Sequence, residues 1–278
     1  MSITFQLVDV FGSGPFTGNP VAVYDGQGLD TETMQQIARW MNLSETTFLL
    51  PPTTDEADYR VRIFTLEREL PFAGHPTLGT CHAWAERTGS SKDRVIQECE
   101  AGLITVERRG GRWAFEAPPL IHTGAVEESS VAEVADFLNI HRSKIVEAEW
   151  VDNGPGWLGI LLGSAEEVLA LEPVSSYPRR MDVGVIGPYP DGHDLAFELR
   201  TFFSNHVGAI VEDPVTGSFQ ASAAEWMIRS GRGHPPYVTA QGTQLGRSGR
   251  AYIDHEGDRL WIGGQTETLA LGDAPFRR

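Results

Sequence analysis

Hydrophobic positions along the chain follow two periods, one typical of strands and one typical of helices. Apolar and polar residues alternate over Thr4–Val10, and a strand pattern resumes at Val21–Tyr24 after a loop dense in glycine and proline. Residues Asp30–Asn42 instead place apolar side chains at i, i+3, i+4 and i+7 from Met34, with Asp30 as N-cap, which predicts an amphipathic helix. The other elements predicted for the first half are strands at about Thr46–Leu50 and Tyr59–Thr65, a helix from about His75 to Gly89, and a strand pair or meander over Val95–Ala117 that turns at Gly110-Gly111.

Pro118-Pro119 marks the predicted boundary between two halves, because consecutive prolines interrupt both a helix and a strand ladder. We therefore divide the chain into residues 1–118 and 119–266, with a C-terminal strand at about 267–278 expected to return to the first half. The elements predicted for the second half are a helix at Val131–Asn139, strands near Ile145–Val151 and Trp157–Leu162, a short helix at Ala165–Leu171, a strand at Leu195–Phe203, a helix at Ser218–Ser230, and closing strands from Tyr237 onward.

The two halves share a sequence of features, which predicts a duplicated α+β unit. In each half an Arg-containing strand leads to a Glu- and Pro-containing turn, then to a glycine, and then to a helix that carries a tryptophan. The matching stretches are Arg62–Thr65, Glu69–Gly74 and Trp84 in the first half, and Arg200–Phe203, Glu212–Gly217 and Trp226 in the second. The fold class expected is therefore α+β.

A glycine begins the tryptophan-bearing helix in each half, and such a helix end can bind an anion. The first N–H groups of a helix have no intrahelical partner, and the helix dipole places positive charge there. Around Gly74, the proline at Pro76 suits the first helical position, which predicts His75 as the cap. In the second half Ser218 is the expected cap, and Gly217 would let a ligand approach the backbone. Each of these residues also has an ordinary structural role in a turn or cap.

Two carboxylates lie beside these elements and are candidates for acid/base chemistry. Asp213 lies four residues before Gly217, and Glu45 follows the end of the first predicted helix. The pKa of a carboxyl group in a closed, desolvated cleft rises toward neutrality, as a general acid or base requires. The alternative is a turn carboxylate beside proline for Asp213 and a solvated strand-start acid for Glu45.

The amino-acid composition argues against nucleic acid and anionic membranes as binding partners. The chain has 278 residues, with 22 Lys and Arg against 38 Asp and Glu, so its formal charge is −16, and 41% of its residues are hydrophobic. This is the composition of an ordinary globular protein. Because binding to nucleic acid or to an anionic membrane requires a basic face, we expect neither partner.

The lack of a recognisable targeting signal and the small number of cysteines indicate a cytoplasmic protein. Residues Met1–Phe11 lack the basic region of a secretory signal, and the longest uncharged run, Asn153–Ala165, is shorter than the ~20 residues of a membrane span. Cys81 and Cys99 are too few for a disulfide framework.

Sequence motifs for cofactors and metals are missing. The glycines that follow Phe11 do not have the spacing of a dinucleotide-binding loop, and the chain has no Walker A or HExxH motif. His75 and His82 lie seven residues apart, but no second pair of ligands at metal spacing accompanies them. We therefore expect no cofactor and no metal.

Five motifs in order give the chain a resemblance to a known family. They are Asp9-Val10-Phe11, Gly18–Val23, Met41–Thr46, Pro71–Gly79 and Val211–Ser218, and Gln241-Gly242, Gly246-Arg247 and Gly263-Gly264 match its C-terminal pattern. Across essentially its whole length the chain resembles the PhzF-like phenazine-biosynthesis isomerases. One departure is Ser248, where proline commonly follows the Gly-Arg pair.

This resemblance implies a fold, a reaction and a set of site residues. The fold would be that of diaminopimelate epimerase, with two pseudo-symmetric α/β halves, each with a sheet wrapped around a central helix, and the active site between them. The reaction would be a cofactor-free proton relocation on a small anionic substrate such as a dihydro-hydroxyanthranilate, in a homodimer. By motif, Glu45 would be the proton shuttle, and the other site residues would be His75, Asp213 and Ser218, which orient the substrate, and Asn19, Ser44, Gly74, Thr216 and Gly217, which bind it.

The resemblance also separates this chain from relatives that use two thiols. The related epimerases and proline racemases carry cysteines immediately before the helix-start glycines, whereas this chain has Ala73 and Thr216 there. Two-thiol racemisation is therefore not expected. A thiol-independent amino-acid epimerase and a non-catalytic metabolite-binding protein remain the alternatives to an isomerase.

Overall fold

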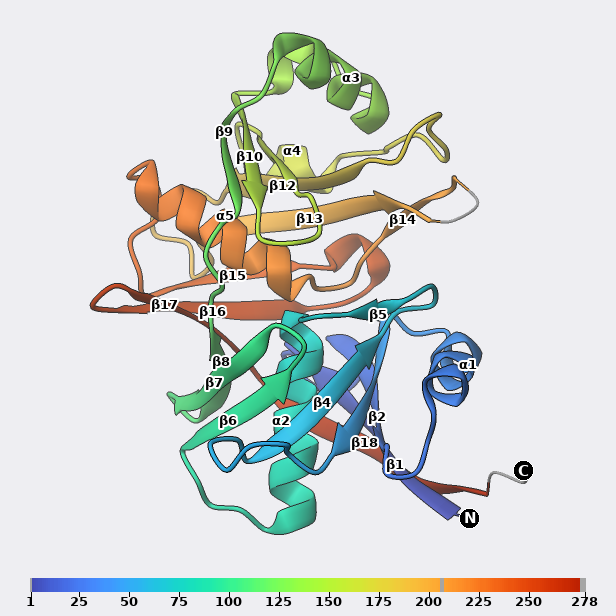
Figure 1. The fold of residues 1–278 in the computed structure, drawn as a ribbon. Helices are drawn as coiled ribbons and strands as arrows, with labels where there is room; N and C mark the ends of the chain where they lie inside the picture. The colour runs from blue at the N-terminus through green and yellow to red at the C-terminus, as the bar shows by residue number, and fades with distance from the viewer. Residues whose placement is uncertain (1, 206–207, 276–278) are drawn as a thin grey trace. The chain divides into compact units, whose positions relative to one another are not determined.

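The computed structural model describes residues 2–205 and 208–275 (Figure 1), and the contacts within it separate two units. The first unit comprises the chain up to Glu116 together with the segment from Gly263, and the second comprises Ala117–Ile262. The last three residues of the strand predicted at 267–278 lie outside the described residues. Within the described part of the chain, no helix is long and apolar enough to cross a membrane.

The first unit is a mixed sheet with two helices. Its elements in chain order are β1 (Ser2–Val10), β2 (Asn19–Asp25), α1 (Thr31–Met41), β3 (Glu45–Leu50), β4 (Tyr59–Phe64), β5 (Glu69–Leu70), α2 (Gly74–Thr88), β6 (Arg94–Cys99), β7 (Gly102–Arg109), β8 (Arg112–Glu116) and β18 (Thr266–Pro275). Strand β18 pairs with β1, and the sheet continues through β2, β3, β4, β6, β7 and β8, with β5 paired to β4. The β2–β3 and β4–β6 pairs are parallel, and the others are antiparallel.

The second unit is built in the same way. Its elements are β9 (His122–Ala125), α3 (Glu128–Leu138), a 3-10 turn (Arg142–Lys144), β10 (Glu147–Asp152), β11 (Leu158–Leu161), α4 (Ala165–Leu169), β12 (Asp182–Pro188), β13 (Phe197–Ser204), β14 (Ile210–Glu212), α5 (Gly217–Arg229), β15 (Tyr237–Gln241), a 3-10 turn (Thr243–Leu245), β16 (Gly249–Glu256) and β17 (Arg259–Gly264), the last of which runs into the first unit. Strands β9, β10, β11, β12 and β13 are neighbours in that order, and β13 also pairs with β14 and β15.

The pairing pattern repeats between the units, which confirms the predicted duplication. In the first unit, β1 and β2 are antiparallel, β2 and β3 are parallel and connected through α1, and β4, antiparallel to β3, is parallel to β6, the strand after α2. In the second unit, β10 and β11 are antiparallel, β11 and β12 are parallel and connected through α4, and β13, antiparallel to β12, is parallel to β15, the strand after α5. Strand β9 pairs with β10 as β18 pairs with β1. The predicted α+β class is therefore present in each unit.

A duplicated ion pair braces the turn before each long helix. Arg62 donates from Nε and an Nη to the two carboxylate oxygens of Glu69 at 2.7 and 2.5 Å, and Arg200 does the same to Glu212 at 2.9 and 2.7 Å. Each guanidinium also lies over a phenylalanine ring on its own strand, about 5 Å from the centroid. The predicted match of these arginines and glutamates is thus a repeated structural device rather than a catalytic one.

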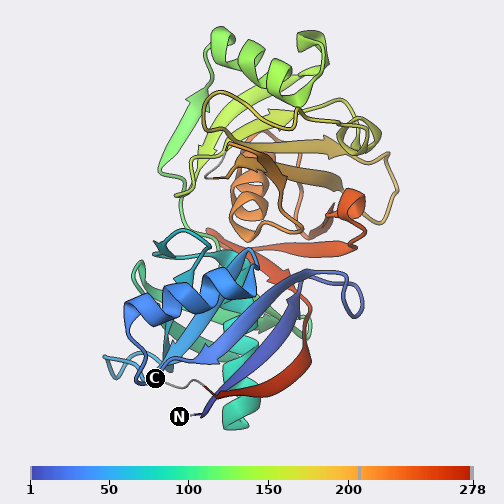
Figure 2. The ribbon, with the colours of Figure 1, turned by 90° about the vertical axis from the view of Figure 1, so that its right-hand side faces the viewer.

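The long helices α2 and α5 are buried in their units, while α1 covers the opposite face of the first sheet, as Figure 2 shows. Alternation along β2 explains this arrangement, since Ala22 and Tyr24 pack with the apolar side of α1 whereas a Cβ at Gly79 of α2 would lie 2.3 Å from Val21. The predicted N-cap of α1 is confirmed, because the Asp30 side chain accepts a hydrogen bond from the Thr33 backbone N–H.

Strand β12 was not predicted, because its segment contains two glycines that lower the strand signal. The structure shows why glycine is required there. A Cβ at Gly184 would lie 2.0 Å from the ring of Phe219 on α5, and a Cβ at Gly187 would lie 2.3 Å from the Ser164 carbonyl oxygen. Both glycines therefore allow close packing of helices onto the sheet.

Replacing Gly184 by alanine is expected to lower the free energy of unfolding by about 1–3 kcal/mol, because the fully buried ring of Phe219 has no space to move away from the new methyl group. Urea titration followed by tryptophan fluorescence measures this loss. Gly14→Ala is the matched control, since nothing lies within 4 Å of the position that its new methyl group would take and its backbone φ is not positive. Equal stability of the two variants would contradict this packing role.

Candidate active site

Three of the predicted site residues meet in the first unit. His75 Nε2 lies 3.5 Å from Glu45 Oε2, and His75 Nδ1 lies 3.5 Å from Asn19 Nδ2. The side chains of His75 and Glu45 are 4% and 16% exposed, and Asn19 is fully buried. The structure thus places a carboxylate with limited solvent contact against an imidazole.

Strand pairing brings these residues together. Glu45 is the first residue of β3 and Asn19 the first of β2, and these strands are parallel neighbours, so both residues lie at the same edge of the sheet. Asn42 ends α1 in the left-handed conformation (φ 54°), and the partly buried Ser44 connects it to β3. The hydroxyl of Thr80 on α2 donates to Thr47 on β3 at 2.9 Å, which fixes the helix against this strand.

The loop before Asn19 is held by a buried carboxylate. Asp9 accepts hydrogen bonds from the backbone N–H groups of Thr17 and Gly18, both at 2.9 Å. A side chain at Gly18 would collide with the Val10 carbonyl oxygen at 2.1 Å, so the loop closes tightly on β1. Asp9, which carried no predicted role of its own, therefore sets the position from which Asn19 faces His75.

Helix α2 begins one residue earlier than predicted, and His75 is not its cap. The N-cap is Ala73, whose side chain makes no capping bond, and Gly74 and His75 are the first two helical residues. The Thr77 N–H closes the first turn on the Ala73 carbonyl at 3.1 Å. The proline at Pro76 occupies the third position, where its missing N–H is equally harmless, and the cap prediction failed for that reason. The N–H groups of Gly74 and His75 have no intrahelical partner.

His75 is neutral at physiological pH. Burial lowers the pKa of His75 to about 3, and a hydrogen bond to the backbone of Pro20 opposes this shift only in part. A neutral imidazole carries one N–H donor and one lone pair, and because the Pro20 backbone can only accept, the N–H is used there and the lone pair remains available to a carboxylic acid. Glu45 can therefore change its ionisation state without facing a fixed positive charge on His75.

The second unit gathers the other predicted residues at the start of α5. The N-cap is Thr216, and Gly217 and Ser218 are the first two residues of the helix, so the prediction of Ser218 as cap was wrong. The Thr216 side chain makes no capping bond, and neither α2 nor α5 has an acidic residue in its first turn. No carboxylate on either helix therefore competes for the positive end of its dipole.

Thr216 is instead part of a buried hydrogen-bond network around Asp213. Its hydroxyl donates to Asp213 Oδ2 at 2.5 Å and lies 2.6 Å from the hydroxyl of Thr201. Gln241 accepts from the Thr216 backbone N–H at 3.0 Å, and its amide nitrogen lies within 3.2 Å of both hydroxyls and the Asp213 carbonyl. Gln241 and Thr201 had no predicted role, although Gln241 belongs to a recognised motif.

The hydroxyl of Ser218 has a defined orientation. It accepts a hydrogen bond from the indole N–H of Trp157 at 3.0 Å, and Asn153 donates to the Ser218 carbonyl at 2.9 Å. Because the indole can only donate, the proton of the Ser218 hydroxyl is directed elsewhere. Trp157 was predicted only as a strand residue, since nothing in a single sequence reports a contact 61 residues distant.

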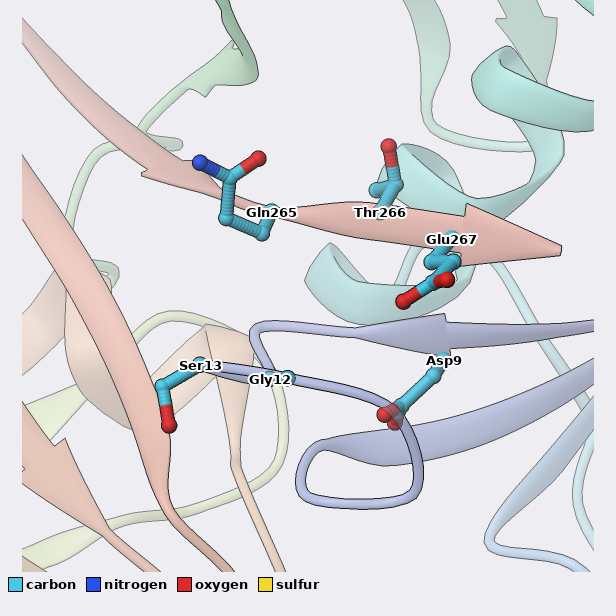
Figure 3. Close-up of a pocket in the computed structure, with 7 residues that line it drawn as sticks. Asp9, Gly12, Ser13, Gln265, Thr266 and Glu267 are labelled. Carbon is cyan, nitrogen blue, oxygen red and sulfur yellow. The ribbon is translucent and has the colours of Figure 1, made fainter. Parts of the chain in front are cut away.

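The lining of a cavity of about 340 Å³ does not include Asn19, Glu45 or His75. Its lining residues are Asp9, Gly12, Ser13, Gly14, Gln265, Thr266 and Glu267, and Figure 3 shows the Asp9 carboxylate turned toward the glycine-rich loop. That carboxylate already accepts the loop N–H groups described above. The cavity therefore borders the loop that supports the site and contains none of the predicted site residues.

Thiol chemistry has no support in the first unit. Cys81 and Cys99 are buried and form no disulfide, and burial raises the pKa of both thiols, so neither is a thiolate at neutral pH. Ala73 and Thr216 are the caps of α2 and α5, the places where the two-thiol enzymes of the resemblance would carry cysteine. Across the described residues, no group of three or more His, Cys, Asp or Glu side chains could hold a metal ion.

Comparison with known proteins identifies relatives that have this sequence pattern and this fold. Residues 8–272 match the family described as phenazine biosynthesis-like protein. The chain is 38% identical to antisense-enhancing sequence 1 of Schizosaccharomyces pombe, with 97% of each chain covered, and 35% identical to trans-2,3-dihydro-3-hydroxyanthranilate isomerase of Pseudomonas aeruginosa, with 91% of this chain and 90% of that one covered. A PhzF-family crystal structure from Enterococcus faecalis matches 99% of this chain and 100% of its own, with a TM-score of 0.80 and 27% identity. The fold implied by the resemblance is confirmed.

Proposed function

Because this chain belongs to the phenazine biosynthesis-like (PhzF) family and is an isomerase, we propose that it moves a proton between carbon atoms of a small carboxylate-bearing substrate without a cofactor. Trans-2,3-dihydro-3-hydroxyanthranilate, the substrate named for the Pseudomonas aeruginosa relative, represents the substrate class. The observation that carries the proposal is the placement of Glu45 against a neutral His75.

Glu45 is the group that removes and returns the proton in this proposal. As a carboxylate it takes a proton from a carbon atom of the substrate, and the electron pair of the broken C–H bond passes into the conjugated system. The resulting carboxylic acid, whose proton can exchange with solvent, then delivers a proton to a different carbon, so that no atom is gained or lost. Neutral His75 places no positive charge beside the Glu45 carboxylate, and its free lone pair can accept from the protonated form of Glu45.

The starts of α2 and α5 serve substrate binding in this proposal. The N–H groups of Gly74, His75, Gly217 and Ser218 have no intrahelical partner and suit a carboxylate or a developing enolate. Asp213 accepts from a substrate amine or hydroxyl, and the Ser218 hydroxyl, oriented by Trp157, donates to the substrate. Asn19, Ser44 and Thr216 complete the proposed binding set. A homodimer and a cytoplasmic location remain predictions.

Incubation in deuterated water tests this function directly. The protein is mixed with trans-2,3-dihydro-3-hydroxyanthranilate, and separately with a panel of amino and hydroxy acids, and carbon-bound deuterium is followed by NMR and mass spectrometry. A shuttle that exchanges with solvent incorporates deuterium at the carbon that receives the proton. We expect incorporation together with product formation for the dihydro-hydroxyanthranilate class.

Other outcomes separate the alternatives. Deuterium at one stereocentre with inversion of configuration would identify an epimerase. Product without deuterium would show a transfer that is faster than exchange, which substrate deuterated at the reacting carbon would reveal through label transfer. Neither product nor deuterium, with a ligand nevertheless bound in calorimetry, would support the binding protein and overturn the proposal.

A further inference from the structure

In each unit a glutamine–threonine hydrogen bond connects the long helix to the sheet, but the two residue types change places between the units. In the first, Gln97 on β6 donates to Thr77 on α2 at 3.0 Å, and in the second, Thr239 on β15 donates to Gln220 on α5 at 2.6 Å. The strand residues occupy equivalent positions, because Gln97 pairs with Tyr59 as Thr239 pairs with Phe197. One glutamine–threonine contact therefore ties each long helix to its sheet.

Gln241 breaks this symmetry. It lies two residues after Thr239, where the first unit has Cys99, two residues after Gln97. The cap Thr216 likewise has Ala73 as its counterpart in the first unit. The first unit thus has no side chains that could form the network around Asp213. This asymmetry indicates that the network serves something other than the shared fold.

The hydrogen bonds of Gln241 have a direction. Its amide oxygen accepts from the Thr216 backbone N–H and from Gln220, both at 3.0 Å. Its amide nitrogen can only donate, and it lies 3.0 Å from the hydroxyls of Thr201 and Thr216. A hydroxyl that accepts from this nitrogen has its own proton available for another acceptor, and for Thr216 that acceptor is Asp213 Oδ2 at 2.5 Å.

We propose that Gln241 is a positioning residue that aims the Thr216 hydroxyl at Asp213 and so holds the carboxylate in the orientation that binds substrate. This inference rests on the proposed function of Asp213. Gln241 also occupies the Thr216 N–H, so the backbone donors that follow it, at Gly217 and Ser218, are the ones that face a substrate anion. Fully buried itself, it acts through Thr216 rather than by touching the substrate.

Two substitutions test the direction of this network. Gln241→Met removes every polar contact, and Gln241→Glu keeps the shape but replaces the donor by an acceptor, which draws the Thr216 proton away from Asp213. Both are expected to lower kcat about 100-fold with a smaller change in KM, the loss expected when a bound substrate is no longer aligned for reaction. Gln97→Met and Gln97→Glu are matched controls, since Gln97 is equally buried and contacts no proposed site residue.

A pH profile separates positioning from mere destabilisation. Once protonated, the carboxyl group introduced by Gln241→Glu can again donate to Thr216 while accepting from its N–H, so this variant is expected to regain kcat as the pH falls. Asp213 is the charged group bonded to this network, and it is present in every variant compared. Neither Gln241→Met nor the Gln97 variants should show this recovery. A Gln241→Glu profile parallel to that of the Gln241→Met variant would overturn the proposal.

Crystal structures of the wild type and the four variants decide the matter independently of turnover. We expect the Asp213 carboxylate and the Thr216 hydroxyl to turn away from each other in both Gln241 variants and to stay in place in both Gln97 variants. An Asp213 carboxylate that stays in place in all four variants would overturn the positioning role. If the wild type shows no proton transfer but Asp213 turns as expected, the proposed function fails while the positioning role stands.

Discussion

Replacement of Glu45 by glutamine is expected to lower kcat by about 10³-fold or more, while the dissociation constant of an anionic ligand changes little. General acid/base catalysis by one positioned side chain typically contributes about 10²–10⁴-fold. Here the same group both removes and returns the proton, so its loss affects both steps. The glutamine amide has nearly the same shape and can still contact His75 at the 3.5 Å distance that Glu45 occupies. Stopped-flow or steady-state turnover and calorimetry with 3-hydroxyanthranilate, an aromatic analogue of the substrate, measure the two quantities.

Glu69→Gln is the matched control for this variant. Glu69 is also a partly buried carboxylate of the first unit, but its oxygens are bound by Arg62, so it is a structural group. Its replacement should leave kcat within a few-fold of the wild type and reduce stability instead. Glu45→Asp, which withdraws the carboxylate by one methylene group, should retain a measurable fraction of turnover. Solvent deuterium exchange that persists unchanged in Glu45→Gln would remove Glu45 from the mechanism.

Local signals were sufficient to predict those parts of the fold that local interactions determine. The helix that begins after Asp30 was correct because its cap and its apolar side lie within one stretch of sequence. The duplication was visible because Glu69 and Glu212 each lie five residues before a helix-start glycine, and a tryptophan follows that glycine after ten residues in the first half and nine in the second. The grouping of Glu45 with His75 came from the resemblance, since no periodicity indicates that β3 lies beside α2.

Features that depend on tertiary contacts were not predicted. Strand β12 was missed because Gly184 is present for the ring of Phe219, which lies 35 residues further along the chain. The caps of α2 and α5 were misplaced because neither Ala73 nor Thr216 makes a side-chain capping bond. A helix start without a side-chain cap violates the local rule that the prediction used, and such violations concentrate at functional sites. Gln241 carried no signal for its network, because its partners come from three other segments of the second unit.

Acidification is expected to destabilise this protein through His75, with a sign that follows from its burial. The pKa of His75 is about 3 in the folded protein and near 6.5 when the chain unfolds. Above pH 6.5 both states hold a neutral imidazole, so the residue has no effect on stability. As the pH falls from 6.5 toward 3 the unfolded state binds the proton and the folded state does not, so the free energy of unfolding declines by up to ~1.4 kcal/mol per pH unit.

At pH 5 this difference amounts to about 2 kcal/mol, because the pH is then about 1.5 units below the pKa of the unfolded state. Urea unfolding at pH 7.5 and pH 5.0 measures it, with His75→Gln as the variant that cannot titrate. The wild type should lose ~2 kcal/mol more than His75→Gln over this interval. Groups that titrate in both proteins, including the partly buried His82, cancel in the comparison. An equal acid-induced loss of stability for wild type and His75→Gln would show that His75 binds its proton in the folded state. Glu45 would then face an imidazolium ion. That positive charge would keep the Glu45 carboxylate ionised and would therefore favour removal of the substrate proton but not the transfer of a proton to it.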